Sequence, residues 1–240
     1  MRETRRNHIA LALDNVTTRD QIVDLIRRTS EWVGIYKVGL EQFTRFGPSI
    51  LDLIRDTDRQ IFLDLKFHDI PNTVAKAVLS ACELGVDYLT IHTQGGVKMM
   101  EAAIEAAGSF SGGKKPKIIG VTLLTSLSGE SLKEELCVNT GVSQYISHLL
   151  SMALEAGLNG VVCSAADLME IRQSFPQNFE VITPGIRPLG SGAGDQKRVA
   201  TPREAIERGA TILVIGRPIT GAQDPGKAAM NIFNQIMAVI

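Results

Sequence analysis

Short apolar runs alternate with longer segments of helical periodicity along the whole chain. The apolar runs predict eight strands, at residues 8–14, 33–38, 60–66, 88–93, 117–124, 160–164, 180–184 and 212–216. Helical segments follow them at residues 18–29, 40–55, 73–84, 96–107, 141–156, 165–174, 202–208 and 225–238. Regular strand–helix alternation is typical of parallel strands.

Eight such units in 240 residues predict an α/β fold, a (β/α)8 TIM barrel that forms a single domain over residues 1–240. The alternative is a doubly wound open sheet. Hydrophobic residues make up 44% of the chain but aromatic residues only 5%, and such a core suits helices packed on a parallel sheet. Residues 125–138 are expected to be a loop with a short helix.

The composition argues against several classes of protein. Lys and Arg number 25 against 26 for Asp and Glu, so we expect no nucleic-acid partner. No apolar stretch reaches the roughly 18 residues of a membrane span, and the run after the basic N-terminus is too short for a signal peptide. The three cysteines, Cys82, Cys137 and Cys163, lack the spacing of a disulfide framework or zinc site. We therefore expect a cytoplasmic protein.

Polar side chains collect at the carboxyl ends of the predicted strands, where the active sites of such barrels lie. In chain order they are Asp14, Lys37, Asp64 with Lys66, His92 with Thr93, Thr122 with Thr125 and Ser126 beyond it, Arg187 and Arg217. We expect His68 and His92 to be structural. Whether Thr125 or Ser126 contacts a polar ring stays open at this point.

Residues 64–73, DLKFHDIPNT, place three charges of alternating sign at the end of one strand. Asp64 and Lys66 are two residues apart, so a regular strand turns them to the same face. Flanking carboxylates, Asp69 included, favour the ammonium form of Lys66, which suits an acid that protonates a carbanion. An ordinary buried ion-pair cluster is the alternative. We expect no metal, because Lys66 already neutralises the two carboxylates.

The segments after the last two strands predict a phosphate site, as recurs in these barrels. Arg187 and Arg217 offer bidentate clamps, and Gly216 permits close approach of a phosphate to the backbone. The glycine-rich loop at 190–194 suits a lid, with Gln196 as a contact. A plain surface loop is the alternative.

The ten-residue segment closely resembles the signature of the orotidine 5′-phosphate decarboxylase family, in its short monofunctional form. Further likeness lies at residues 12–14, 36–39, 122–126, 183–188, 195–198 and 214–219. The resemblance implies decarboxylation of orotidine 5′-monophosphate to UMP, the last step of pyrimidine synthesis, without metal or organic cofactor.

The resemblance also implies a role for each residue. Asp14 and Lys37 hold the ribose, Asp64 lies against the substrate carboxylate, and Lys66 protonates C6. The family forms homodimers with shared sites, and Asp69, Ile70 and Thr73 then serve the neighbouring subunit. The remaining contacts are Thr125 to the pyrimidine and Arg187, Gln196, Gly216 and Arg217 to the phosphate.

Two rival functions remain at this point. A Mg²⁺-dependent sugar-phosphate decarboxylase or aldolase of the same barrel superfamily shares an Asp-x-Lys-x-x-Asp core, but residues 70–73 favour the nucleotide enzyme. The other rival is a barrel that binds nucleotide phosphates without turnover. The intact Asp64, Lys66 and Asp69 argue against it, since a pure binder does not need them.

Overall fold

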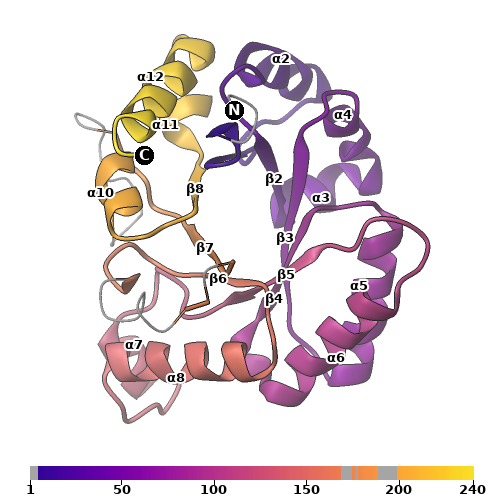
Figure 1. Ribbon diagram of the computed structural model, residues 1–240, viewed down its shortest axis with the longest axis vertical. Helices are drawn as coiled ribbons and strands as arrows, with labels where there is room; N and C mark the ends of the chain where they lie inside the picture. The colour runs from indigo at the N-terminus through magenta and orange to yellow at the C-terminus, as the bar shows by residue number, and fades with distance from the viewer. Residues whose placement is uncertain (1–4, 169–174, 177, 189–198) are drawn as a thin grey trace.

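Eight parallel strands form a closed barrel in sequential order, in a computed structural model that describes residues 5–168, 175–176, 178–188 and 199–240 (Figure 1). The strands are β1 Ile9–Ala12, β2 Ile35–Gly39, β3 Gln60–Phe67, β4 Tyr88–His92, β5 Lys117–Val121, β6 Gly160–Val162, β7 Glu180–Thr183 and β8 Ile212–Ile215. The pairing of β1 with β8 closes the ring, with Ile9 opposite Leu213. The predicted (β/α)8 barrel is therefore confirmed and the open sheet is wrong. That residues 1–240 form one domain stays a prediction.

Helices surround the strands, and α12 lies beside α2 where the ends of the chain meet (Figure 1). They are α2 Arg19–Thr29, α3 Leu40–Phe46, α4 Asp52–Arg55, α5 Pro71–Glu83, α6 Val97–Ser109, α7 Gly129–Glu134, α8 Val142–Glu155, α10 Pro202–Glu207, α11 Arg217–Thr220 and α12 Pro225–Met237, with 3-10 turns η1 Pro48–Ile50 and η2 Thr93–Gly95. None of the helices within the described ranges is both long and apolar enough to cross a membrane.

One predicted helix is wrong in extent. The segment 40–55 forms α3, η1 and α4 in place of one helix. Gly47 ends α3 with a φ of 64°, a left-handed conformation that glycine adopts without strain, and Pro48 then opens η1. The helix predicted at 165–174 falls largely outside the described residues, and α11 was not predicted.

The barrel interior is built in layers that follow the two-residue period of the strands. The layer nearer the amino ends of the strands is apolar and packs as one cluster: Ala10, Ile35, Phe62, Tyr88, Ile119, Ile182 and Ile212. Two residues further along β2, β3 and β4 stand Lys37, Asp64 and Thr90, which are polar yet buried. The apolar layer thus fills the barrel on the amino-terminal side, and the buried polar side chains form the next layer toward the carboxyl ends of the strands.

Candidate functional site

A pocket of about 370 Å³ opens at the carboxyl ends of the strands. Its polar lining consists of Asp14, Asn15, Lys37, Asp64, Lys66, Thr125, Arg187 and Arg217. Strands β5, β6 and β8 line it with apolar side chains, including Val121, Val162 and Val214. The pocket therefore has a charged side, built by the first three strands, and an apolar side.

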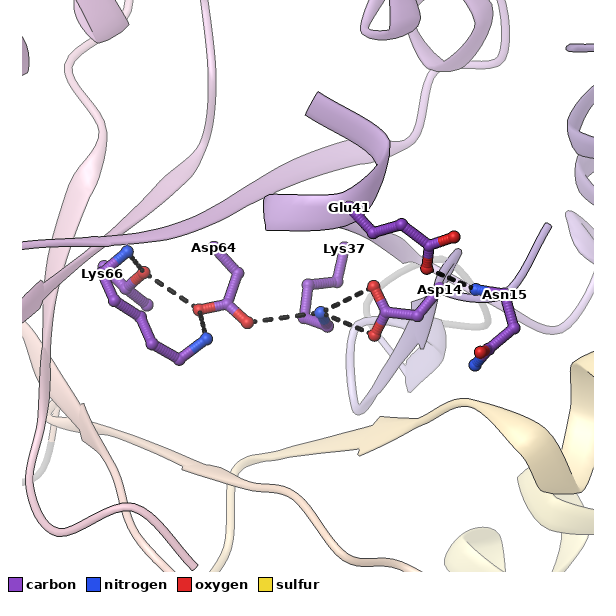
Figure 2. A network of polar contacts seen from close by, with 7 residues as sticks. Asp14, Asn15, Lys37, Glu41, Asp64 and Lys66 are labelled. Carbon is purple, nitrogen blue, oxygen red and sulfur yellow. Dashed lines mark hydrogen bonds and ion pairs between the residues drawn. The ribbon is translucent and has the colours of Figure 1, made fainter. Parts of the chain in front are cut away.

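Four charged side chains of alternating sign run in one line along the charged side (Figure 2). The Lys37 Nζ atom lies 3.1 Å from Asp14 Oδ2 and 3.2 Å from Asp64 Oδ2. The Lys66 Nζ atom lies 2.8 Å from Asp64 Oδ1. Asp64 is thus clamped between two ammonium groups, one on each oxygen. We call these four residues the charged chain.

The centre of the charged chain is deeply buried. Side-chain exposure is 9% for Lys37 and 11% for Asp64, against 40% for Asp14 and 28% for Lys66. Burial opposes ionisation of Asp64, but Lys37 and Lys66 outweigh it and hold its pKa below the ordinary 3.8. Burial likewise opposes the charge on Lys37, but Asp64 and Asp14 raise its pKa above 10.5. Both groups are therefore charged at neutral pH.

The contact between Lys66 and Asp64 does not arise from the regular alternation of side chains along a strand. The register between β3 and β4 shifts between Leu63 and Phe67, and Lys66 itself has a φ of 51°. Such a left-handed backbone is uncommon for any residue with a side chain. The predicted contact is confirmed, but its cause is a bulge in β3 and not the simple two-residue period.

Asp69 stands outside the charged chain of its own subunit, and the prediction that it serves the neighbouring subunit's site stays a prediction. Asp69 is exposed, and its Oδ1 accepts a hydrogen bond from the backbone N–H of Ile70 at 2.7 Å. Ile70 is 66% exposed and Thr73 is also exposed. These residues lie past the turn from β3 into α5, away from the pocket lining of their own chain.

The predicted phosphate and ring contacts gather at the pocket where the structure describes them. Arg187, Gly216, Arg217 and Thr125 all line it. Ser126 is not among the lining residues, so the geometry favours Thr125 as the ring contact. Gln196 and the loop 190–194 lie outside the described residues.

His68 and His92 form a pair of rings 5.4 Å apart, and neither lines the pocket. Burial lowers the pKa of His92, and the neighbouring His68 and Lys66 charges act in the same direction. These effects favour the neutral form of His92. The expectation that both rings are structural stays a prediction.

Two residues of the site were missed by sequence reasoning. Asn15 lines the pocket with a φ of 66°, and its backbone N–H donates to Glu41 Oε2 at 3.0 Å (Figure 2). Asparagine tolerates the left-handed region better than most residues, which was the available signal. Thr90, the third residue in β4, contacts both Asp64 and Lys66. No sequence signal marks it, because its role depends on strand register.

The model of the orotidine 5′-phosphate decarboxylase / HUMPS family matches residues 7–232. The chain belongs to this family. A curated relative from Shewanella sediminis, named orotidine 5′-phosphate decarboxylase, is 46% identical over 231 residues and the match covers 96% of this chain and 97% of the relative. A relative of the same name from Syntrophus aciditrophicus is 45% identical over 232 residues, covering 95% and 92%.

The barrel also matches a solved structure of that name. The crystal structure of orotidine 5′-phosphate decarboxylase from Lactobacillus acidophilus superposes with a TM-score of 0.83 at 32% identity, covering 96% of this chain and 99% of that one. The resemblance inferred from residues 64–73 is therefore confirmed at the level of family and fold. Two members of the charged chain, Asp64 and Lys66, lie on β3, the strand that leads into that segment.

Proposed function

We propose that this chain decarboxylates orotidine 5′-monophosphate to UMP and carbon dioxide. Family membership supports the reaction. The curated relatives that this chain matches over nearly their whole length are named for that carboxy-lyase. The observation that carries the mechanism is the fixed Lys66 ammonium, held 2.8 Å from Asp64 at the edge of the pocket.

The reaction requires an acid beside a localised carbanion. When the bond from C6 to the carboxylate breaks, its electron pair stays on C6, in an orbital that no carbonyl of the ring can relieve by conjugation. A preorganised ammonium stabilises that charge and then donates its proton to C6. Lys66 fills this role, and solvent returns its proton after UMP leaves.

Asp64 holds the proton donor in place and faces the group that departs. Its two oxygens accept from Lys37 and Lys66, and its depressed pKa keeps it ionised. A fixed carboxylate beside the substrate carboxylate disfavours the ground state electrostatically, and this repulsion ends when carbon dioxide leaves. The lysines on either side keep Asp64 from taking up a proton instead.

The other pocket residues bind the rest of the nucleotide. Asp14 and Lys37 suit the ribose hydroxyls, because both line the pocket and offer it acceptor and donor atoms. Thr125 offers a hydroxyl to the pyrimidine, and Arg187, Gly216, Arg217 and Gln196 are the expected phosphate contacts. Binding energy from the phosphate end then serves to orient the ring.

A second subunit would complete the site in our proposal. Asp69, Ile70 and Thr73 are exposed and turned out of their own pocket, as residues that serve a neighbouring subunit would be. An isoleucine with 66% exposure beside the rim also suits burial in an interface. We therefore propose a homodimer with shared sites. We also propose that it acts in the cytoplasm on a small molecule, and that it binds neither nucleic acid nor membrane.

The direct test is a metal-free assay that follows the loss of absorbance of orotidine 5′-monophosphate, with a chelator present. We expect turnover that the chelator leaves unchanged, whereas a requirement for Mg²⁺ would favour the sugar-phosphate enzymes. Lys66→Ala should lower kcat by about 10³-fold or more while UMP still binds. Retained turnover in Lys66→Ala would overturn its role, and UMP binding without turnover in the wild type would indicate a binding protein.

Mixing two inactive variants tests the shared site. Lys66→Ala lacks the proton donor, and Asp69→Asn lacks the carboxylate that we assign to the neighbouring site. In a mixed dimer one site carries both defects and the other carries none, so an equal mixture should recover about a quarter of wild-type activity after subunit exchange. If the mixture stays as inactive as the separate variants while subunits demonstrably exchange, Asp69 serves its own chain.

A further inference from the structure

Thr90 lies beneath the charged chain without lining the pocket. It belongs to β4, faces the barrel interior two residues beyond Tyr88, and is fully buried. It sits next to Asp64, which occupies the same layer on the adjacent strand β3. A hydroxyl in that position must find partners, because a buried unpaired polar group is costly.

The hydroxyl of Thr90 joins two parts of the Asp64–Lys66 pair. Its Oγ1 accepts a hydrogen bond from the backbone N–H of Lys66 at 2.9 Å. The same oxygen lies 3.0 Å from Asp64 Oδ1. A backbone N–H can only donate and the hydroxyl has a single proton, so that proton points to the ionised carboxylate. The Asp64 oxygen that it reaches is the one that also accepts from Lys66 Nζ.

Lys66 needs such a partner because its own backbone leaves the regular sheet. The register shift between Leu63 and Phe67 and the φ of 51° at Lys66 mark a bulge in β3. An uncommon backbone conformation persists only where its surroundings fix it. The Thr90 hydroxyl receives the Lys66 N–H at this point, so one side chain secures both the Lys66 backbone and the carboxylate that orients the Lys66 ammonium.

We propose that Thr90 is a positioning residue of the reaction, whose hydroxyl fixes Asp64 and the Lys66 backbone relative to each other and so aims the Lys66 ammonium at C6. This inference rests on the proposed decarboxylation. A positioning role differs from a merely structural one in which kinetic quantity a Thr90 variant should lose. Thr90 does not line the pocket, so its hydroxyl should matter to the chemical step and not to binding of the nucleotide.

Two comparisons isolate the effect of the Thr90 hydroxyl: the wild type against Thr90→Val, and Thr90→Ser against Thr90→Ala. Thr90→Val keeps the shape of the wild-type side chain and removes the hydroxyl. Thr90→Ala and Thr90→Ser differ from each other by the hydroxyl alone, and they serve if the valine variant does not fold. The control is Thr29→Val in α2, where a buried hydroxyl bonds to Leu25 O and the Tyr36 hydroxyl, and none of these three residues lines the pocket.

The measurements are kcat and KM for orotidine 5′-monophosphate, the affinity for UMP, and the thermal midpoint. Thr90→Val and Thr90→Ala should each lose about 10- to 100-fold in kcat, as expected when a hydrogen bond to a charged catalytic group is removed. KM and UMP affinity should stay within about threefold of the wild type. Thr90→Ser should recover most of the kcat lost by Thr90→Ala, and Thr29→Val should lose stability without losing kcat.

The inference fails if Thr90→Val turns over like the wild type, or if Thr90→Ser falls as far as Thr90→Ala. It also fails if UMP affinity drops in step with kcat, because the hydroxyl then supports the pocket in general. These outcomes are separate from the failure of the proposed function, which a wild-type chain without decarboxylase activity would show.

Discussion

Replacing Lys37 by Met removes the charge at the centre of the charged chain while keeping most of the side-chain volume. The Lys37 Nζ–Asp64 Oδ2 separation of 3.2 Å corresponds to about 5 kcal/mol of attraction at an effective dielectric constant of ~20. Burial of both groups offsets much of that attraction. The second pair, with Asp14, adds little, because the Asp14 side chain is 40% exposed to screening solvent.

The expected loss follows from what the variant leaves behind. Asp64 would remain buried with Lys66 and Thr90 as its partners. Breaking a buried pair by removing one partner costs about 3–5 kcal/mol, and the remaining partners place Lys37→Met near the lower end, at about 3 kcal/mol. Urea unfolding, with the midpoint compared at an unchanged slope, measures this loss.

A double-mutant cycle with Asp64→Asn decides whether the loss comes from the pair. Asp64→Asn removes the charge that faces Lys37 and leaves the shape of the side chain. If the two charges stabilise each other, the double variant should be about 2 kcal/mol more stable than the sum of the single losses predicts. Losses that add to within about 0.5 kcal/mol would refute the reasoning, because the two sites would then be independent.

Three further predictions concern the same site. The folded pKa of Asp64 lies below 3.8 and that of Lys37 above 10.5, so their stabilisation is present between these values. This stabilisation is lost as the pH falls through the folded pKa of Asp64 or rises through that of Lys37. The free energy of unfolding measured across pH checks this. The Lys37→Met variant should lack the alkaline loss that Lys37 causes. A Cβ on Gly39 would lie 2.9 Å from Asp14 Oδ1 and 3.0 Å from Lys37 Nζ, so Gly39→Ala should lower kcat/KM by about 10- to 100-fold, and an unchanged kcat/KM would contradict the close approach. Arg217→Ala should raise KM for the nucleotide about 10- to 100-fold in steady-state kinetics, whereas turnover of orotidine, which lacks the phosphate, should not change.

The strands were predictable because their signal is local. Six of the eight begin at the predicted residue, among them β3 at Gln60 and β8 at Ile212. Their ends are less accurate: β5 ends at Val121 and not at residue 124. An apolar run marks a strand through burial, but where a strand ends depends on pairing with its neighbours. Thr122 and Thr125 therefore follow the strand as part of the loop.

The charged residues were predictable in kind but not in grouping. The position of Asp69 five residues after Asp64 suggested one triplet, and the turn into α5 carries Asp69 out of the pocket. Lys37 and Asp14 were expected at the same rim, and the structure brings them into direct contact. Residues from different strands meet only through barrel closure, which local sequence cannot measure.

The sequence by itself determined the alternating elements and the rim at which the polar residues collect, because the burial period and strand direction are properties of each segment alone. The tertiary structure decided which of those residues touch. The contact of Lys66 with Asp64 depends on the bulge in β3, and the Thr90 hydroxyl reaches both across residue separations of 24 and 26. Such contacts depend on the register between β3 and β4, and register is set by the closed barrel as a whole.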